Sequence, residues 1–155
     1  MRLTQELRPG QLHFSIEIPP GWVVVVDTAS GALRALLAGR VSHRPDASVV
    51  TVGTADFWLK PFDLPAGSLA TYAEREMARH VRQGEPSRFS DRIGGLEALG
   101  YEWTDGVMDI ATWFVAPSPS VGVRVDHAIS ALGPLSRPNV SARAEGAILL
   151  ASVTW

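Results

Sequence analysis

The sequence predicts an α+β fold, in which an antiparallel β-sheet of about six strands carries helices packed on it. Four segments rich in strand-forming residues follow one another between residues 88 and 129, with only short turns between them. Short links join antiparallel neighbours, whereas parallel strands need long crossover connections. Residues 69–83 place apolar side chains at three- and four-residue spacing, which is typical of a helix with one face on a sheet. We expect the 155 residues, 1–155, to form a single domain.

The N-terminal part is predicted to form two strands separated by a tight turn. Residues 14–18 (FSIEI) alternate apolar and polar side chains, as expected of a strand with one solvated face. Pro19 and Pro20 end this strand because proline has no N–H to continue a ladder. The run 23–26 (VVVV) after Trp22 is β-branched throughout, which suits a strand covered on both faces.

The middle of the chain is predicted to contain a central strand and the first helix. Residues 32–41 fit a short helix or a strand, and both alternatives stay open. Residues 48–58 have strong strand propensity, with a bulge or bend expected at Gly53. A proline-bearing connection over 60–65 then leads to Ser68, which is placed to cap the helix that follows.

The last part of the chain is predicted to form an antiparallel meander and a second helix. The strands are expected at 88–93, 96–103, 107–116 and 121–129. The pair Asp105-Gly106 is typical of a hairpin turn. Asn139 or Ser141 is expected to cap the second helix, and the final residues 151–155 fit either a last strand or an apolar helix tail.

The composition limits the partners that the chain is expected to meet. Cysteine is absent, so disulfides, thiolate nucleophiles and cysteine metal sites are excluded. A formal net charge of −2 gives no broad attraction for nucleic acid or for an anionic membrane. No segment has the length of a membrane span or the pattern of a signal peptide, so we expect a cytoplasmic protein without membrane insertion.

Four segments resemble motifs of the PsbP-like superfamily, which includes the photosystem PsbP proteins, a Ran-binding nuclear protein and the DcrB family. Residues 14–22 (FSIEIPPGW) resemble its opening strand and P-x-G-W turn, and residues 68–81 (SLATYAEREMARHV) resemble its central helix. Residues 92–103 (RIGGLEALGYEW) resemble its G-x-x-A strand entry, and residues 147–155 (AILLASVTW) resemble its closing helix. The resemblance implies an α/β/α sandwich with no shared catalytic apparatus and a protein-binding role. Its DcrB-like members include cytoplasmic, dimeric chaperones of secretion effectors.

The tryptophans supply the first candidate site. Trp58, Trp103 and Trp113 lie in predicted strands and are the candidate partner- or ligand-binding residues. If Trp103 and Trp113 pair across the hairpin on an exposed face, they form an aromatic patch suited to an apolar ligand or a partner helix. Core packing is the default expectation for all three side chains, and the aromatic patch is the alternative.

A second candidate site is polar. Glu102 and Asp109 flank the predicted hairpin and His127 lies on the following strand, so acid–base groups are present in neighbouring segments. A solvated hairpin end is the alternative. The four histidines lack metal-binding spacing, and the chain has no nucleophile elbow, dinucleotide fingerprint or P-loop. We therefore expect no metal, no cofactor and no catalytic residue from a known motif.

These observations favour a non-enzymatic protein-binding, adaptor or chaperone-like domain. Its sheet is expected to present an apolar, tryptophan-bearing face to another protein or to a second copy of itself, because aromatic side chains with few charges are typical of interfaces. The alternative is a small enzyme or small-molecule-binding protein with a pocket between sheet and helix.

Overall fold

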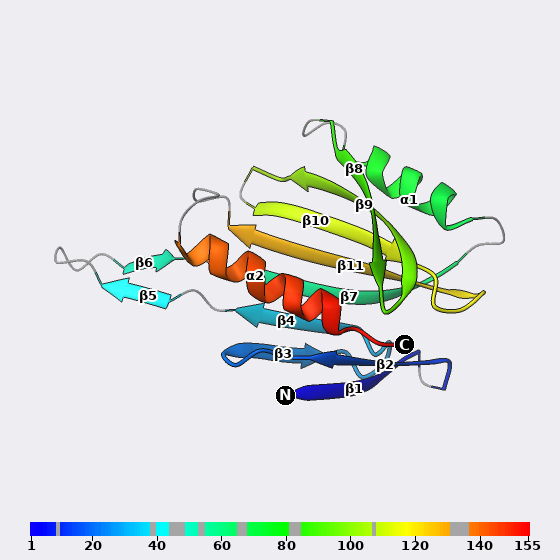
Figure 1. The fold of residues 1–155 in the computed structure, drawn as a ribbon, viewed down its shortest axis with the longest axis horizontal. Coiled ribbons are helices and arrows are strands. Elements are labelled where there is room, and N and C mark those ends of the chain that lie inside the picture. The colour runs from blue at the N-terminus through cyan, green and yellow to red at the C-terminus, as the bar shows by residue number, and fades with distance from the viewer. Residues whose placement is uncertain are drawn as a thin grey trace.

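Seven strands form the main antiparallel sheet, namely β3 (Trp22–Val26), β4 (Leu33–Leu37), β7 (Ala55–Asp63), β8 (Ser87–Ile93), β9 (Leu96–Thr104), β10 (Met108–Val115) and β11 (Val121–Ser130) (Figure 1). Their order across the sheet is β3-β4-β7-β11-β10-β9-β8. Two separate ribbons pair β1 (Arg2–Leu7) with β2 (Leu12–Glu17) and β5 (Arg40–His43) with β6 (Val49–Val52). The helices are α1 (Leu69–Ala78) and α2 (Arg137–Ser152). The computed structural model describes residues 1–8, 10–37, 40–43, 49–52, 55–64, 68–80, 85–106, 108–130 and 137–155.

The predicted α+β class and antiparallel sheet are confirmed, and so is the meander. β8, β9, β10 and β11 are consecutive in the chain and each pairs with the next in antiparallel register. Gly106 has φ +89°, in the left-handed region that favours glycine, and the Asp105 carboxylate accepts the backbone N–H of Met108 at 2.6 Å. The main sheet has seven described strands where about six were expected.

The prediction that residues 48–58 form one strand of the main sheet, bulged or bent at Gly53, was wrong for its first half, whereas β7 does lie inside the sheet between β4 and β11. β6 pairs with β5 in a ribbon, β7 belongs to the main sheet, and Gly53 lies outside the described residues. The open choice for residues 32–41 is resolved as strand over Leu33–Leu37, because β4 pairs with both β3 and β7, while Gly39 lies outside the described residues. Pro61 lies inside β7 rather than in a connection. β4 pairs with β7 only as far as Leu59, so in the described part of the structure no strand pairs with that edge of β7 at Pro61, and a missing N–H is tolerated there.

The first helix begins as predicted and ends earlier. Ser68 has an extended backbone and its hydroxyl accepts the N–H of Thr71 at 3.1 Å, which confirms the cap. α1 ends at Ala78, whereas the sequence predicted a helix as far as residue 83; residues 81–84 lie outside the description.

The second helix begins earlier than predicted. α2 starts at Arg137, so Asn139 and Ser141 lie inside the helix and the capping prediction was wrong. After Ser152 the chain leaves the helix, and Thr154 exchanges backbone hydrogen bonds of 2.8 and 2.9 Å with Ser15 of β2. Residues 151–155 therefore combine a helix end with one strand-like bridge. Neither described helix is both long and apolar enough to cross a membrane.

The core lies between the main sheet, the β1-β2 ribbon and α2. Strand alternation turns Val123, Val125 and His127 of β11 toward α2, and it turns Arg124 and Asp126 toward α1.

The ribbon and the helix α2 complete this core. The strand β1, which the sequence did not predict, contributes the fully buried Leu7. A Cβ at Gly146 would lie 2.1 Å from the His127 ring, so this helical glycine allows α2 to approach β11 closely. The fully or almost fully buried members of this core include Phe14, Ile16, Phe57, Leu59, Val115, Leu149 and Val153.

A smaller apolar cluster lies beneath α1. Ala73 and Met77 of the helix pack on Tyr101 of β9 and Phe114 of β10. Tyr72 stacks on Phe62 with ring centroids 3.9 Å apart, which fixes the start of the helix against the end of β7. Figure 1 shows α1 beside β8 at one end of the sheet, with α2 along β7 and β11.

Candidate binding surfaces on the α1 side of the sheet

Helix α1 packs on β9 and β10, at one end of its side of the sheet. The same side of the sheet extends away from the helix toward β3. Directly paired residues share a side, and Asp126 of β11 pairs with Trp58 of β7. Trp58 in turn pairs with Arg34 of β4, and Arg34 pairs with Val25 of β3. We call the part carried by β3, β4 and β7 the open face; its residues are Val23, Val25, Arg34, Leu36, Asp56, Trp58 and Lys60.

Strand β3 is exposed on the open face. Val23 and Val25 are 57% and 55% exposed, whereas Trp22 is buried in the core. The prediction that residues 23–26 are covered on both faces was therefore wrong. β3 is an edge strand of the sheet, and α1 covers the opposite end of the same side.

Trp58 lies between two cationic side chains on the open face. The Arg34 guanidinium is 4.6 Å and the Lys60 amine 3.6 Å from the centroid of its ring, within the range of cation–π attraction. Arg34 also binds Asp56 with hydrogen bonds of 2.6 and 3.1 Å. The indole therefore lies among side chains of both charges.

Lys60 is the only lysine of the chain. In the described part of the structure no ion pair joins it to a carboxylate. Burial, the largest cause, lowers the pKa of Lys60, and the nearby charge of Asp126 opposes this shift. The amine is thus a cation that the described carboxylates do not neutralise by direct contact.

A buried ionic network fixes α1 to the sheet. The Arg124 guanidinium lies 2.8 Å from Asp126 and 3.6 Å from Glu76 of α1. Burial opposes its charge, but Asp126 and Glu76 raise the pKa of Arg124 above its ordinary value. The network continues from Asp126 to the Thr112 hydroxyl, which donates at 2.7 Å and accepts the Trp103 indole N–H at 3.1 Å.

The Tyr101 hydroxyl is buried beneath α1, and no hydrogen bond of good geometry joins it to a described residue, although the Thr112 hydroxyl lies near it. Its cross-strand neighbour Thr112 donates its own proton to Asp126 instead. Burial, the largest cause, raises the pKa of Tyr101 to about 12, and the nearby carboxylates of Asp126 and Glu76 act in the same direction. The phenol is therefore suited to packing and not to proton transfer near neutral pH.

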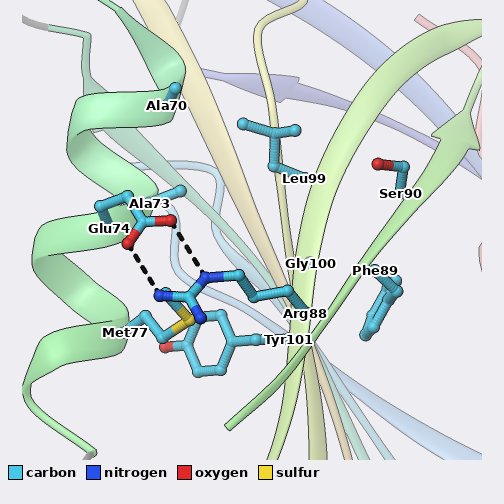
Figure 2. A pocket seen from close by; sticks show the side chains of 10 residues that line it. All are labelled: Ala70, Ala73, Glu74, Met77, Arg88, Phe89, Ser90, Leu99, Gly100 and Tyr101. Carbon is cyan, nitrogen blue, oxygen red and sulfur yellow. Dashed lines mark hydrogen bonds and ion pairs between the residues drawn. The ribbon is translucent and has the colours of Figure 1, made fainter.

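A hollow of about 270 Å³ lies between α1 and the edge of the sheet formed by β8 and β9 (Figure 2). Arg88 of β8 spans its mouth and binds Glu74 of α1 through two hydrogen bonds of 3.2 and 3.1 Å. The Phe89 ring turns away from α1 and packs on Trp113 at 5.6 Å between centroids. The residues around the hollow are Ala70, Ala73, Glu74, Met77, Arg88, Phe89, Ser90, Leu99, Gly100 and Tyr101.

The structure separates the tryptophans that the sequence placed together. Trp103 pairs with Ile110 and Trp113 pairs with Gly100, so the two indoles lie on opposite faces of the sheet and form no shared patch. Trp113 is only 8% exposed and donates to Asp91 at 3.2 Å. Trp103 stacks on His80 at 3.7 Å. Of the three predicted tryptophans, Trp58 is the one on the open face.

The predicted polar residues share one side of the sheet. Glu102 pairs with Ala111, which pairs with His127, and strand alternation places Asp109 on the same side. This is the α2 side, where His127 packs against Gly146. The three residues thus lie away from the hollow and from the open face.

Sequence reasoning did not single out the pairs that now define the candidate sites. Glu74 and Arg88 are 14 residues apart, on a helix and a strand, and their contact depends on how α1 crosses β8. Arg34 and Asp56 meet because β4 and β7 are neighbours in the sheet. The sequence offered one usable signal, namely that Lys60 is the chain's single lysine beside a strand tryptophan.

Solved structures of low sequence identity share this fold. LpqN of Mycobacterium tuberculosis, a protein involved in cell envelope biogenesis, aligns with a TM-score of 0.56 and 14% identity, over 99% of this chain and 90% of LpqN. A protein of Bacteroides thetaiotaomicron aligns with a TM-score of 0.51 and 16% identity, over 99% of this chain and 48% of that protein. The chain thus spans about half the length of the Bacteroides protein. No protein-family profile and no curated protein matches the sequence. These two proteins share with this chain the arrangement of strands and helices.

Proposed function

We propose that the chain is a non-enzymatic protein-binding domain with an adaptor or chaperone-like role, and that it takes an extended segment of another protein along β3 and the open face. The observation that carries the proposal is the exposure of Val23 and Val25, at 57% and 55%, on an edge strand with no charged residue. An edge strand offers unpaired backbone groups to an incoming strand, and its exposed side chains supply specificity.

The two edges of the main sheet differ in the way that this proposal requires. β8 carries Arg88, Asp91 and Arg92, and charged side chains of this kind discourage pairing with another chain. β3 reads WVVVV and has no charge or proline. In the described part of the structure no strand pairs with its outer edge. Pairing at β3 therefore meets less resistance than pairing at β8.

The open face also favours a partner of a particular composition. Apolar contacts come from Val23, Val25 and Trp58, and the Lys60 amine has no described carboxylate in ion-pair contact. An apolar segment with an acidic side chain near Lys60 matches this pattern. The PsbP-like resemblance of the sequence supports a binding role, because that superfamily lacks a shared catalytic apparatus. The cytoplasmic location expected from the sequence stays a prediction.

Crosslinking from the edge strand tests the proposal. A photo-crosslinking amino acid at Val25 is expected to attach one defined protein segment in cells of the source organism. The same amino acid at Ser90 of β8 is the matched control and is expected to attach none, because the charges of β8 oppose pairing. A crosslink to the same segment from both positions, or none from Val25, contradicts the proposal.

A binding measurement then separates a specific partner from a chance neighbour. A synthetic peptide that covers the crosslinked segment is expected to bind the purified chain in calorimetry. Val25→Asp should weaken it by about tenfold or more, because the charge is desolvated in an apolar contact, and Ser90→Asp should leave the affinity unchanged. If the crosslinked segment is β3 of a second copy, light scattering should show a dimer that Val25→Asp dissociates. Equal loss in both variants contradicts the proposed surface.

A further inference from the structure

The hollow beside α1 combines apolar walls with one cation at its mouth. Leu99 and Tyr101 of β9 and Met77 of α1 line it, and Arg88 is the one positively charged residue among those around it (Figure 2). At about 30 Å³ for each water-sized group, 270 Å³ holds about nine such groups. Sites for drug-sized ligands are larger, at about 300 to 1,000 Å³. The volume of this hollow therefore suits a smaller ligand with a short apolar chain.

The ion pair at the mouth can be exchanged for a ligand. The side chains of Arg88 and Glu74 are 58% and 60% exposed. Solvent screens an exposed ion pair and rehydrates its charges when it opens, so opening it costs the fold little. A guanidinium that already holds one carboxylate through two hydrogen bonds has the geometry to hold another in its place.

We propose that this hollow binds a medium-chain carboxylic acid, whose carboxylate takes the place of Glu74 on Arg88 while its chain lies between α1 and β9. The short stems of Ala70 and Ala73 on the facing side of the helix leave room for the chain. Apolar contact with Met77, Leu99 and Tyr101 removes the chain from water, and each buried CH₂ group adds to the affinity. The inference is independent of the β3 edge, which lies at the other end of the sheet.

Three probes test the chemistry of the site. Calorimetry with decanoate, decanol and decylammonium is expected to show binding in the order decanoate, decanol, decylammonium, because only the carboxylate gains two charge-assisted hydrogen bonds from Arg88. Equal binding of decanoate and decylammonium indicates adsorption to apolar surface and overturns the proposal. Failure of decanoate to bind at millimolar concentration overturns it as well.

Two substitutions at the mouth are expected to act in opposite directions. Arg88→Gln should weaken decanoate by about tenfold and leave decanol unchanged, because it removes the charged hydrogen bonds. Glu74→Gln should tighten decanoate several-fold, because it removes the competing carboxylate. Arg92→Gln is the matched control, since Arg92 is another exposed arginine of β8 that does not line the hollow. A purely structural ion pair predicts the same change in both mouth variants, and that result overturns the proposal.

Filling the hollow supplies a test that does not depend on charge. Ala70 is exposed and lines the hollow without belonging to the buried cluster under α1. Ala70→Leu is therefore expected to keep the thermal unfolding midpoint and to abolish binding of both decanoate and decanol. Undiminished binding by a folded Ala70→Leu variant places the ligand elsewhere and overturns the proposed site.

Discussion

At the scale of single residues, Gly31 shows how one position can decide whether two elements meet. It has φ +74°, and a Cβ there would lie 1.8 Å from the backbone oxygen of Glu6 in β1. The contact is part of the junction at which the Arg8 N–H donates to the Ser30 carbonyl at 2.8 Å. Gly31→Ala is expected to lower the free energy of unfolding by about 3 kcal/mol or more, because backbone must move to admit the methyl group. Urea unfolding monitored by tryptophan fluorescence measures the loss.

Gly106 is the matched control for this substitution. It has φ +89°, but a Cβ there would meet no atom within 4 Å. Gly106→Ala should therefore cost only the conformational strain, about 1 to 2 kcal/mol. If the two alanine variants lose the same stability, the close approach of β1 to Gly31 does not matter energetically.

Tyr101 predicts a pH dependence at the alkaline end. Its folded-state pKa of about 12 lies above the unfolded value near 10, so the unfolded chain releases the phenolic proton first as the pH rises. The stability associated with this group is fully present below about pH 10 and falls as the pH approaches about 12. Tyr101→Phe should lose less stability over this range than the parent. Denaturant titrations at a series of alkaline pH values test the difference, and parallel curves for the two proteins contradict it.

At the scale of elements, α1 is attached to the sheet by one buried and one exposed ion pair. Arg124 contacts both Glu76 and Asp126, whose side chains are 9% and 13% exposed, whereas the Arg88 pair with Glu74 is mostly solvated. Among the described residues, Arg124→Met leaves the buried Asp126 without its ion-pair partner and leaves Glu76 paired only with the mostly exposed Arg79 at the end of α1. We expect a loss of about 3 kcal/mol. Thermal and urea unfolding measure this loss at neutral pH.

Arg88→Met gives the corresponding change at the exposed pair. Its expected cost is much smaller than that of Arg124→Met, because solvent screens the interaction in the folded chain and rehydrates both charges after its removal. A smaller loss for Arg124→Met than for Arg88→Met contradicts the assignment of the buried network as the main polar attachment of α1.

Elements whose signals are local could be predicted, and those that depend on distant partners could not. The strands β8 to β11 and the Ser68 cap follow from residues close in sequence. The identity of β4 depends on pairing with β3 and β7, and the placement of Pro61 depends on where β4 ends. Local propensity contains neither fact. For the same reason the sequence did not show that Val23 and Val25 lie at an uncovered edge.

The sequence shows which residue types are present at the candidate site but not how they are arranged in space. Trp58 and Lys60 are close in sequence, but their relation to Arg34 requires the β4–β7 register. Trp103 and Trp113 form no shared patch, an arrangement that the sequence left open, because the hairpin register sets them on opposite faces and a shift of one residue is enough to invert a face. The chemistry of each side chain can be inferred from the sequence, whereas its neighbours across the sheet are determined by the strand register.

At the scale of the whole molecule, the last three residues join elements from both ends of the chain. Val153 is buried in the core, and Thr154 pairs with Ser15 of the N-terminal ribbon. The Trp155 indole donates to the Ile93 carbonyl at 3.0 Å and covers the turn between β8 and β9. The tail therefore connects the β1-β2 ribbon to the far edge of the main sheet.

Deleting residues 153–155 is expected to lower the free energy of unfolding by about 4 kcal/mol, because it removes a buried valine side chain, a partly buried indole and two backbone hydrogen bonds to Ser15. Amide exchange should also become faster at Ser15, whose N–H donates to Thr154. Thr154→Ala is the control: its side chain is exposed and its backbone bridge is kept, so the change should stay within about 0.5 kcal/mol. If the deletion costs no more than this control, the ribbon is held by α2 and the core alone, and the C-terminal bridge contributes no stability.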